Sequence, residues 1–159
     1  MVEVELLEAD VDREVGVPRM VLRELGGASR LLTIFIGGVE MHAIQLALEG
    51  HEPPRPMTHD LFRDVLGELG TVLERVVITE LRDSTFFAEL HLSTNGQGKV
   101  VSSRPSDAVA LAVRIGCRIF VSEEVLDEAA APPAEVAADE VVEQFREFID
   151  SVNPEDFAS

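Results

Sequence analysis

The feature that most constrains the fold of this chain is a short apolar helix predicted over residues 105–116. Pro105 suits the first turn of a helix, where its missing N–H is not needed, and Gly116 suits the residue just past the end. Residues 108–113 are apolar on every side, so this helix must be buried rather than amphipathic. We therefore expect the rest of the chain to cover it, and 159 residues with 46% hydrophobic content suffice for a real core.

The predicted helix begins at a polar cluster formed by Arg104, Ser106 and Asp107. One interpretation is structural: these side chains cap the helix and form a local ion pair. The other is a phosphate-binding site, in which Arg104 makes a bidentate contact and Ser106 donates its hydroxyl to an anion at the helix N-terminus. Asp107 would then hold a cation or accept a proton. The sequence leaves both interpretations open.

Hydrophobic periodicity predicts strands on both sides of this helix. They are expected over residues 2–6, 20–22, 30–36, 72–81, 86–93, 99–102 and 118–121. Residues 10–18 favour a turn, and Asn95-Gly96 is a strong hairpin signal. The run 31–36 is apolar on both faces, which is typical of a central strand.

Further helices are expected over residues 39–48, over 58–69 with Thr58 as the N-cap, from Ser122 onward, and over 136–152. The second of these is the clearest amphipathic helix, because its apolar side chains share one stripe: Leu61, Phe62, Val65, Leu66 and Leu69. The pattern predicts the α+β class, with a compact mixed sheet packed with helices over residues 1–131. An acidic C-terminal amphipathic helix and tail over residues 132–159 would follow this domain.

Charge and targeting signals restrict the partners and the compartment. The formal net charge of −17, with a single lysine, disfavours binding to nucleic acid and to anionic membranes. Cys117 is the only cysteine, so an intrachain disulfide framework is excluded. The N-terminus carries no signal-peptide pattern, and no segment approaches the ~20 apolar residues that span a bilayer. We therefore expect a cytoplasmic protein that does not enter a membrane.

A second group of residues suits acid–base or metal chemistry. His59 and Asp60 are adjacent, and Glu40, His42 and Asp107 are the side chains that could complete a metal site with them. The alternative is again structural, because acidic residues in the first turn of a helix are stabilised by the helix dipole. The candidate catalytic residues are Asp107, His59, Asp60 and Glu40, and the candidate phosphate-binding residues are Arg104 and Ser106.

Several short motifs of this chain resemble the bifunctional nuclease domain family. They follow the family's order along about residues 1–130: Ile36-Gly37-Gly38-Val39-Glu40, Pro54-Arg55-Pro56-Met57-Thr58-His59-Asp60-Leu61, Phe86-Phe87-Ala88-Glu89-Leu90, Ser103-Arg104-Pro105-Ser106-Asp107-Ala108 and Ile119-Phe120-Val121-Ser122-Glu123-Glu124-Val125-Leu126. The resemblance implies a compact mixed α/β fold that self-associates. It also implies cleavage of RNA and DNA, the activity for which plant members of the family are named.

Two functions remain open at this point. The first is a nuclease that hydrolyses phosphodiester bonds in RNA or DNA, assisted by a divalent cation such as Mg²⁺ that neutralises phosphate and activates water. The sequence does not identify the metal. The second is a non-catalytic regulatory or interaction module that binds a small anion or a protein partner. For either function we expect a homo-oligomer, with a dimer favoured.

Overall fold

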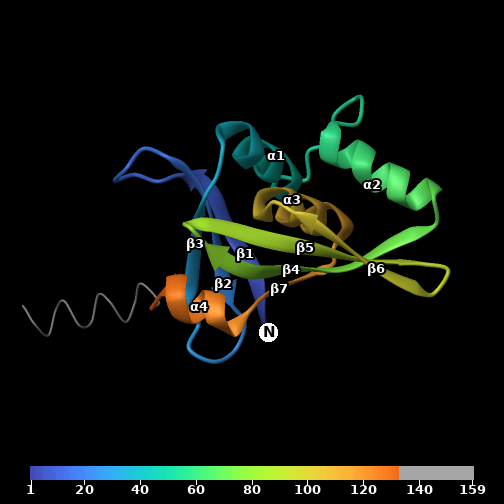
Figure 1. Cartoon of the computed structure of the whole chain (residues 1–159). Coiled ribbons are helices and arrows are strands. Elements are labelled where there is room, and N and C mark those ends of the chain that lie inside the picture. The colour runs from blue at the N-terminus through green and yellow to red at the C-terminus, as the bar shows by residue number, and fades with distance from the viewer. Residues whose placement is uncertain (133–159) are drawn as a thin grey trace, which may run out of the picture.

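The strands form one mixed sheet. In the computed structural model, which describes residues 1–132, eight strands lie in the order β6-β5-β4-β7-β1-β2-β3-β8 (Figure 1). They are β1 (Val2–Val11), β2 (Pro18–Glu24), β3 (Leu31–Phe35), β4 (Thr71–Arg82), β5 (Thr85–Thr94), β6 (Gln97–Ser103), β7 (Arg118–Val121) and β8 (Ala130–Ala131). Neighbouring strands are antiparallel except β4 and β7, which run parallel.

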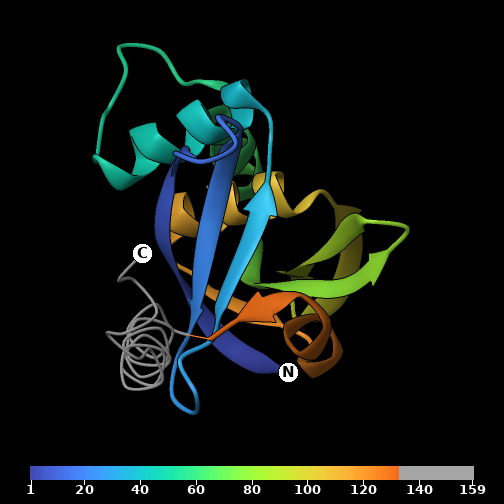
Figure 2. The same cartoon turned by 90° about the vertical axis from the view of Figure 1, so that its left-hand side faces the viewer.

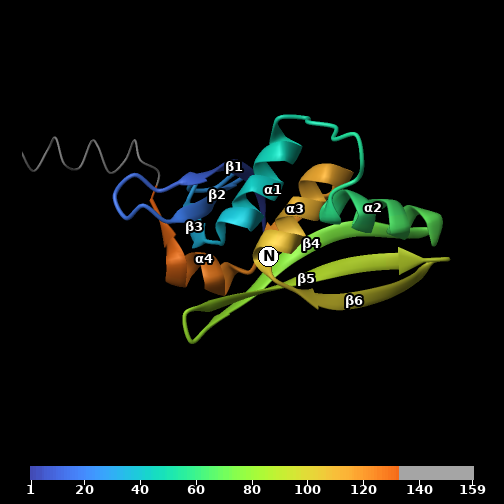
Figure 3. The same cartoon turned by 90° about the horizontal axis from the view of Figure 1, so that it is seen from above.

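Four helices pack against this sheet in the described part of the chain: α1 (Gly38–Leu48), α2 (Thr58–Glu68), α3 (Pro105–Ile115) and α4 (Glu123–Ala129). Helices α1, α2 and α3 lie side by side over the curled sheet, and α3 contacts both of the other two (Figure 3). Helix α4 lies at the far end, next to β8 and β3 (Figure 2). The predicted α+β class is confirmed.

The prediction of a central buried helix is confirmed by α3. It begins at Pro105 and ends before Gly116, whose φ of 78° lies in the left-handed region that glycine adopts without strain. Its middle residues are at most 2% exposed: Ala108, Val109, Ala110, Leu111 and Ala112. The alanines among them present little side-chain bulk, which lets neighbouring elements approach the helix closely.

The expected turn at residues 10–18 is shorter than predicted, because β1 continues to Val11 and only residues 12–17 reverse the chain. The acidic residues at the end of β1 remain in the strand since Arg19 of β2 pairs with them. Arg19 Nη2 lies 3.0 Å from Glu8 Oε1, and Arg19 Nε lies 3.0 Å from Asp10 Oδ1. Cross-strand ion pairs therefore extend the hairpin beyond what the apolar pattern indicates.

The prediction that residues 31–36 form a central strand is wrong. β3 pairs with β2 on one side and only with the two-residue β8 on the other, so it lies next to the edge of the sheet. Leu32 and Ile34 face the core and are 0% and 4% exposed, whereas Phe35 on the opposite face is 55% exposed. The continuous apolar run over residues 31–36 therefore has only one buried face, although such a run is typical of strands buried on both faces.

Helix α2 differs from its prediction at its start and in the direction of its apolar stripe. Its N-cap is Met57 rather than Thr58, and Asp60 Oδ2 accepts a hydrogen bond from the Met57 N–H at 3.0 Å. No residue of α2 is buried, and of its apolar stripe Leu66 alone packs against the core. The remaining apolar side chains of this helix face solvent.

The helix predicted over residues 136–152 lies outside the described residues. Within residues 1–132, no helix is long and apolar enough to cross a membrane.

Candidate functional site

The candidate residues from three different helices meet at the N-terminus of α3. Arg104 is the N-cap of α3, Asp107 lies in its first turn, and Glu40 lies in the first turn of α1. His59 lies in the first turn of α2. The folding of α1 and α2 against α3 therefore places four of the six predicted site residues around one point.

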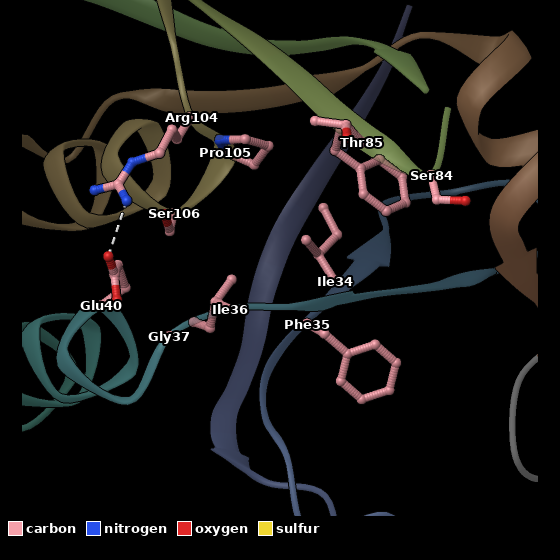
Figure 4. A pocket seen from close by; sticks show the side chains of 11 residues that line it. Ile34, Phe35, Ile36, Gly37, Glu40, Ser84, Thr85, Arg104, Pro105 and Ser106 are labelled. Carbon is pink, nitrogen blue, oxygen red and sulfur yellow. Dashed lines mark hydrogen bonds and ion pairs between the residues drawn. The ribbon is translucent and has the colours of Figure 1, made fainter. Parts of the chain in front are cut away.

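Arg104 is the centre of this cluster. Its Nε lies 2.7 Å from Asp107 Oδ2, and its Nη2 lies 3.2 Å from Asp107 Oδ1. Its Nη1 lies 2.9 Å from Glu40 Oε1 (Figure 4). The Arg104 side chain is nevertheless 64% exposed. A single guanidinium thus joins carboxylates of α1 and α3 while keeping one side open to solvent.

His59 and Asp107 form a hydrogen-bonded pair. His59 Nε2 lies 2.9 Å from Asp107 Oδ1, and the His59 side chain is 15% exposed. Partial burial of Asp107 opposes its ionisation, but the hydrogen bonds from Arg104 and His59 outweigh it and lower the pKa of this carboxyl. Asp107 is therefore ionised at neutral pH and orients the His59 ring.

Asp60 takes part in a different ion pair. Its Oδ1 lies 2.6 Å from Arg114 Nε, and the two side chains are 14% and 5% exposed. Arg114 also donates to the carbonyl oxygens of Ala110 and Ala43, so it links α1, α2 and α3. Burial opposes ionisation of Asp60, yet the hydrogen bond from Arg114 keeps the pKa of this carboxyl below its ordinary value. Asp60 therefore pairs with Arg114 and does not join the cluster around Arg104.

Two cavities adjoin the cluster, and Arg104 and Glu40 line both of them. One cavity, of about 250 Å³, also contains His59, Asp107 and His42 in its lining. The other, of about 270 Å³, contains Ser106. Ser106 is only 6% exposed, and α3 has no side-chain cap, so the predicted capping role for this hydroxyl is not observed.

The donor set does not fit a divalent cation. No three or more His, Cys, Asp or Glu side chains within residues 1–132 gather closely enough to hold a metal ion. Glu40 and Asp107 are both already paired with Arg104, and Asp60 is paired with Arg114. A cation would have to displace Arg104, which itself supplies positive charge at this point.

Two supporting residues were not predicted to belong to the site. Arg114 lies in the last turn of α3, and its pairing with Asp60 joins positions 54 residues apart. Gly37 is the N-cap of α1, and a Cβ atom there would lie 2.1 Å from Glu40 Oε2. Gly37 therefore leaves room for the Glu40 carboxylate to reach Arg104. The Gly37-Gly38 dipeptide is the one signal in the sequence that could have identified it.

The sequence of this chain is similar to those of several known proteins. An uncharacterized protein of Mycobacterium tuberculosis is 42% identical over 165 residues, covering 99% of this chain and 98% of the relative. Bifunctional nuclease 1 and Bifunctional nuclease 2 of Arabidopsis thaliana are each 29% identical over 64% and 65% of this chain. The matched segment spans 32% of each Arabidopsis protein. The family model described as the bifunctional nuclease domain matches residues 20–134, and the chain therefore belongs to the bifunctional nuclease domain family.

Proposed function

We propose that this protein is a nuclease that cleaves phosphodiester bonds, with single-stranded RNA as its preferred substrate. The observation that supports the proposal is the 2.9 Å contact between His59 and Asp107 beside the guanidinium of Arg104. A histidine held by a carboxylate is a general base, and an arginine beside it can stabilise the charge of a phosphate undergoing attack.

The geometry assigns the ring nitrogens of His59. Because Nε2 faces Asp107, Nδ1 is the nitrogen left to accept a proton. On RNA, His59 takes the proton of the 2′-hydroxyl, the 2′-oxygen bonds to phosphorus, and the P–O5′ bond breaks. The leaving O5′ is protonated by His42 from the same cavity or by water, which gives a 2′,3′-cyclic phosphate and a 5′-hydroxyl. DNA lacks this internal nucleophile, so the same step cannot occur on DNA, and we expect no cleavage of DNA by this route.

The phosphate must compete with carboxylates for Arg104. Both Glu40 and Asp107 hold its guanidinium, and a formal net charge of −17 repels polyanions. The exposed side of Arg104 allows the guanidinium to exchange Glu40 for a phosphate oxygen without unfolding the site. We therefore expect weak substrate binding that decreases further as salt concentration rises.

The test is cleavage of a short fluorescent RNA and of the DNA of the same sequence, each with EDTA and with Mg²⁺. Cleavage of RNA should persist in EDTA because the base is His59 and the cation is Arg104. His59→Ala and Asp107→Asn should each lower the rate by about 100-fold or more. His51→Ala, which removes an exposed histidine of the loop before α2, is the matched control and should retain full activity. Activity that survives both site substitutions would refute the assignment.

A second candidate function is a non-catalytic module that binds a small anion. It is favoured by the complete pairing of Arg104 with two carboxylates, which is a stable resting state. In this case no substrate is cleaved, and inorganic phosphate raises the melting temperature. Glu40→Gln should strengthen phosphate binding, since it removes the competing charge while Asp107 continues to position Arg104. RNA cleavage and phosphate binding, measured on the same preparations, thus distinguish the two functions: only a nuclease cleaves the RNA.

A further inference from the structure

We infer that the cavity of about 270 Å³ beside Arg104 binds a nucleobase. The inference rests on the proposed function and adds a recognition subsite to it. Arg104 and Glu40 form the wall between this cavity and the cavity that holds His59 and Asp107. A nucleotide with its phosphate at Arg104 would therefore place its base in one cavity and its scissile bond toward the other.

The walls of this base cavity suit a flat apolar ring. Ile34 and Ile36 lie on one side, and Pro105 and Thr85 lie across from them (Figure 4). Phe86 of β5 adds an aromatic ring to the lining. Base–aromatic stacking is tolerant of sequence because every base has a π-face. The hydrocarbon lining therefore favours a heterocycle over a hydrated ion.

Three side chains add neutral hydroxyls to the base cavity. Ser106 is 6% exposed and lines the cavity. Ser84, from the turn between β4 and β5, and Thr85, the first residue of β5, add two further hydroxyls at the rim. A hydroxyl both donates and accepts hydrogen bonds, so these side chains suit the ring nitrogens and exocyclic groups of a nucleobase.

Charge distribution argues against a phosphate inside this cavity. Its charged lining residues are Arg104 and Glu40, which pair with each other at one edge. The Glu40 carboxylate also lies over Gly37 at the start of α1, so an anion would meet a negative charge at that helix N-terminus. The charged part of a nucleotide thus stays at the Arg104 edge, and the neutral base enters the cavity.

The experiment measures binding of AMP, UMP and ribose 5-phosphate to the full chain by calorimetry at low salt. None of these ligands contains a phosphodiester bond, so binding is measured without cleavage. The wild-type protein should bind AMP more tightly than ribose 5-phosphate. Phe86→Leu should weaken AMP binding roughly tenfold, as expected for loss of one stacking contact, and leave ribose 5-phosphate unchanged. Ser106→Ala should also weaken AMP binding selectively.

Phe87→Leu is the matched control, because Phe87 is the next residue of β5 and lies against Arg82, outside this cavity. It should bind AMP as the wild type does.

If Phe86→Leu does not fold, Thr85→Trp at the exposed rim should block the cavity and give the same loss of AMP binding. Equal binding of AMP and ribose 5-phosphate by the wild type would overturn the inference, as would unchanged AMP binding in the variants. Loss of RNA cleavage in His59→Ala with intact AMP binding would support both proposals. The two can fail separately, because RNA cleavage tests the nuclease function and AMP binding tests the base cavity.

Discussion

Arg104 and Arg114 lie at the two ends of α3 and have different roles. Arg104 is largely exposed and bridges Glu40 and Asp107, so its contacts can exchange for those of a ligand. Arg114 is 5% exposed and is fully occupied by Asp60 and two backbone carbonyls. The exposed Arg104 is therefore available to bind a ligand, whereas the buried Arg114 holds the helices together. The two arginines differ in how far their side chains are buried.

The buried pair predicts a large effect of Asp60→Asn. Removing one partner of a buried ion pair leaves the other charge uncompensated, so we expect a loss of about 3–5 kcal/mol in the free energy of unfolding, measured by urea denaturation. Asp64→Asn in the same helix is the control, because the Arg63–Asp64 pair is 45% and 46% exposed and should contribute less than ~1 kcal/mol. Equal losses in the two variants would contradict a packing role for Arg114.

At the scale of elements, α2 is oriented with its polar side inward. His59 and Asp60 face α3, whereas Leu61, Phe62, Val65 and Leu69 are 45–67% exposed. Site chemistry and apolar surface thus lie on opposite sides of one helix. Met57, which is 50% exposed, extends this apolar face, and a two-fold contact would cover the face on both copies. We propose that the chain dimerises through this face of α2.

Val65→Asp should convert a dimer into a monomer, because it introduces a charge at the centre of the apolar stripe. The measurement is mass in solution by light scattering after size-exclusion chromatography. Val15→Asp, at a 60% exposed position in the turn between β1 and β2, is the matched control and should leave the mass unchanged. A monomeric wild type, or a dimer that tolerates Val65→Asp, would rule out this interface.

At the scale of the whole molecule, a few arginines compensate many carboxylates. The chain has 30 acidic and 13 basic residues. Arg19 pairs with three carboxylates of the first hairpin, and Arg30 pairs with Glu24, Glu123 and Asp127, which joins β2 to α4. The fold thus places Arg19 and Arg30 where several acidic side chains meet.

This charge pattern predicts a loss of stability in acid. The hydrogen bond from Arg30 lowers the pKa of Glu24, and the pKa values of Asp60 and Asp107 are also lowered. A carboxyl whose pKa is lower in the folded than in the unfolded state stabilises the fold above its unfolded pKa. That stabilisation is lost as pH falls through the folded pKa, so the melting temperature should fall below about pH 4. In Arg30→Gln this acid-dependent loss should be smaller. A melting temperature that rises steadily from pH 7 to pH 3 would show that relief of charge repulsion dominates instead.

Local signals in the sequence determined several elements. Pro105, the apolar run after it and Gly116 define α3, because proline, burial and left-handed glycine each act within a few residues. The hairpin at Asn95-Gly96 is determined in the same way, since both residues have positive φ values. The motifs that identify the family are also short and contiguous.

The tertiary structure alone decided which of these residues meet. His59 and Asp107 are 48 residues apart in the chain, and Arg104 and Glu40 are 64 apart. Their pairing depends on how α1 and α2 pack on α3, and periodicity does not specify that packing. For the same reason the sequence could not show that β3 lies beside the edge of the sheet or that α2 turns its apolar side outward. A hydrophobic pattern records which residues avoid water, whereas the partner that removes them from water is set by contacts between distant segments.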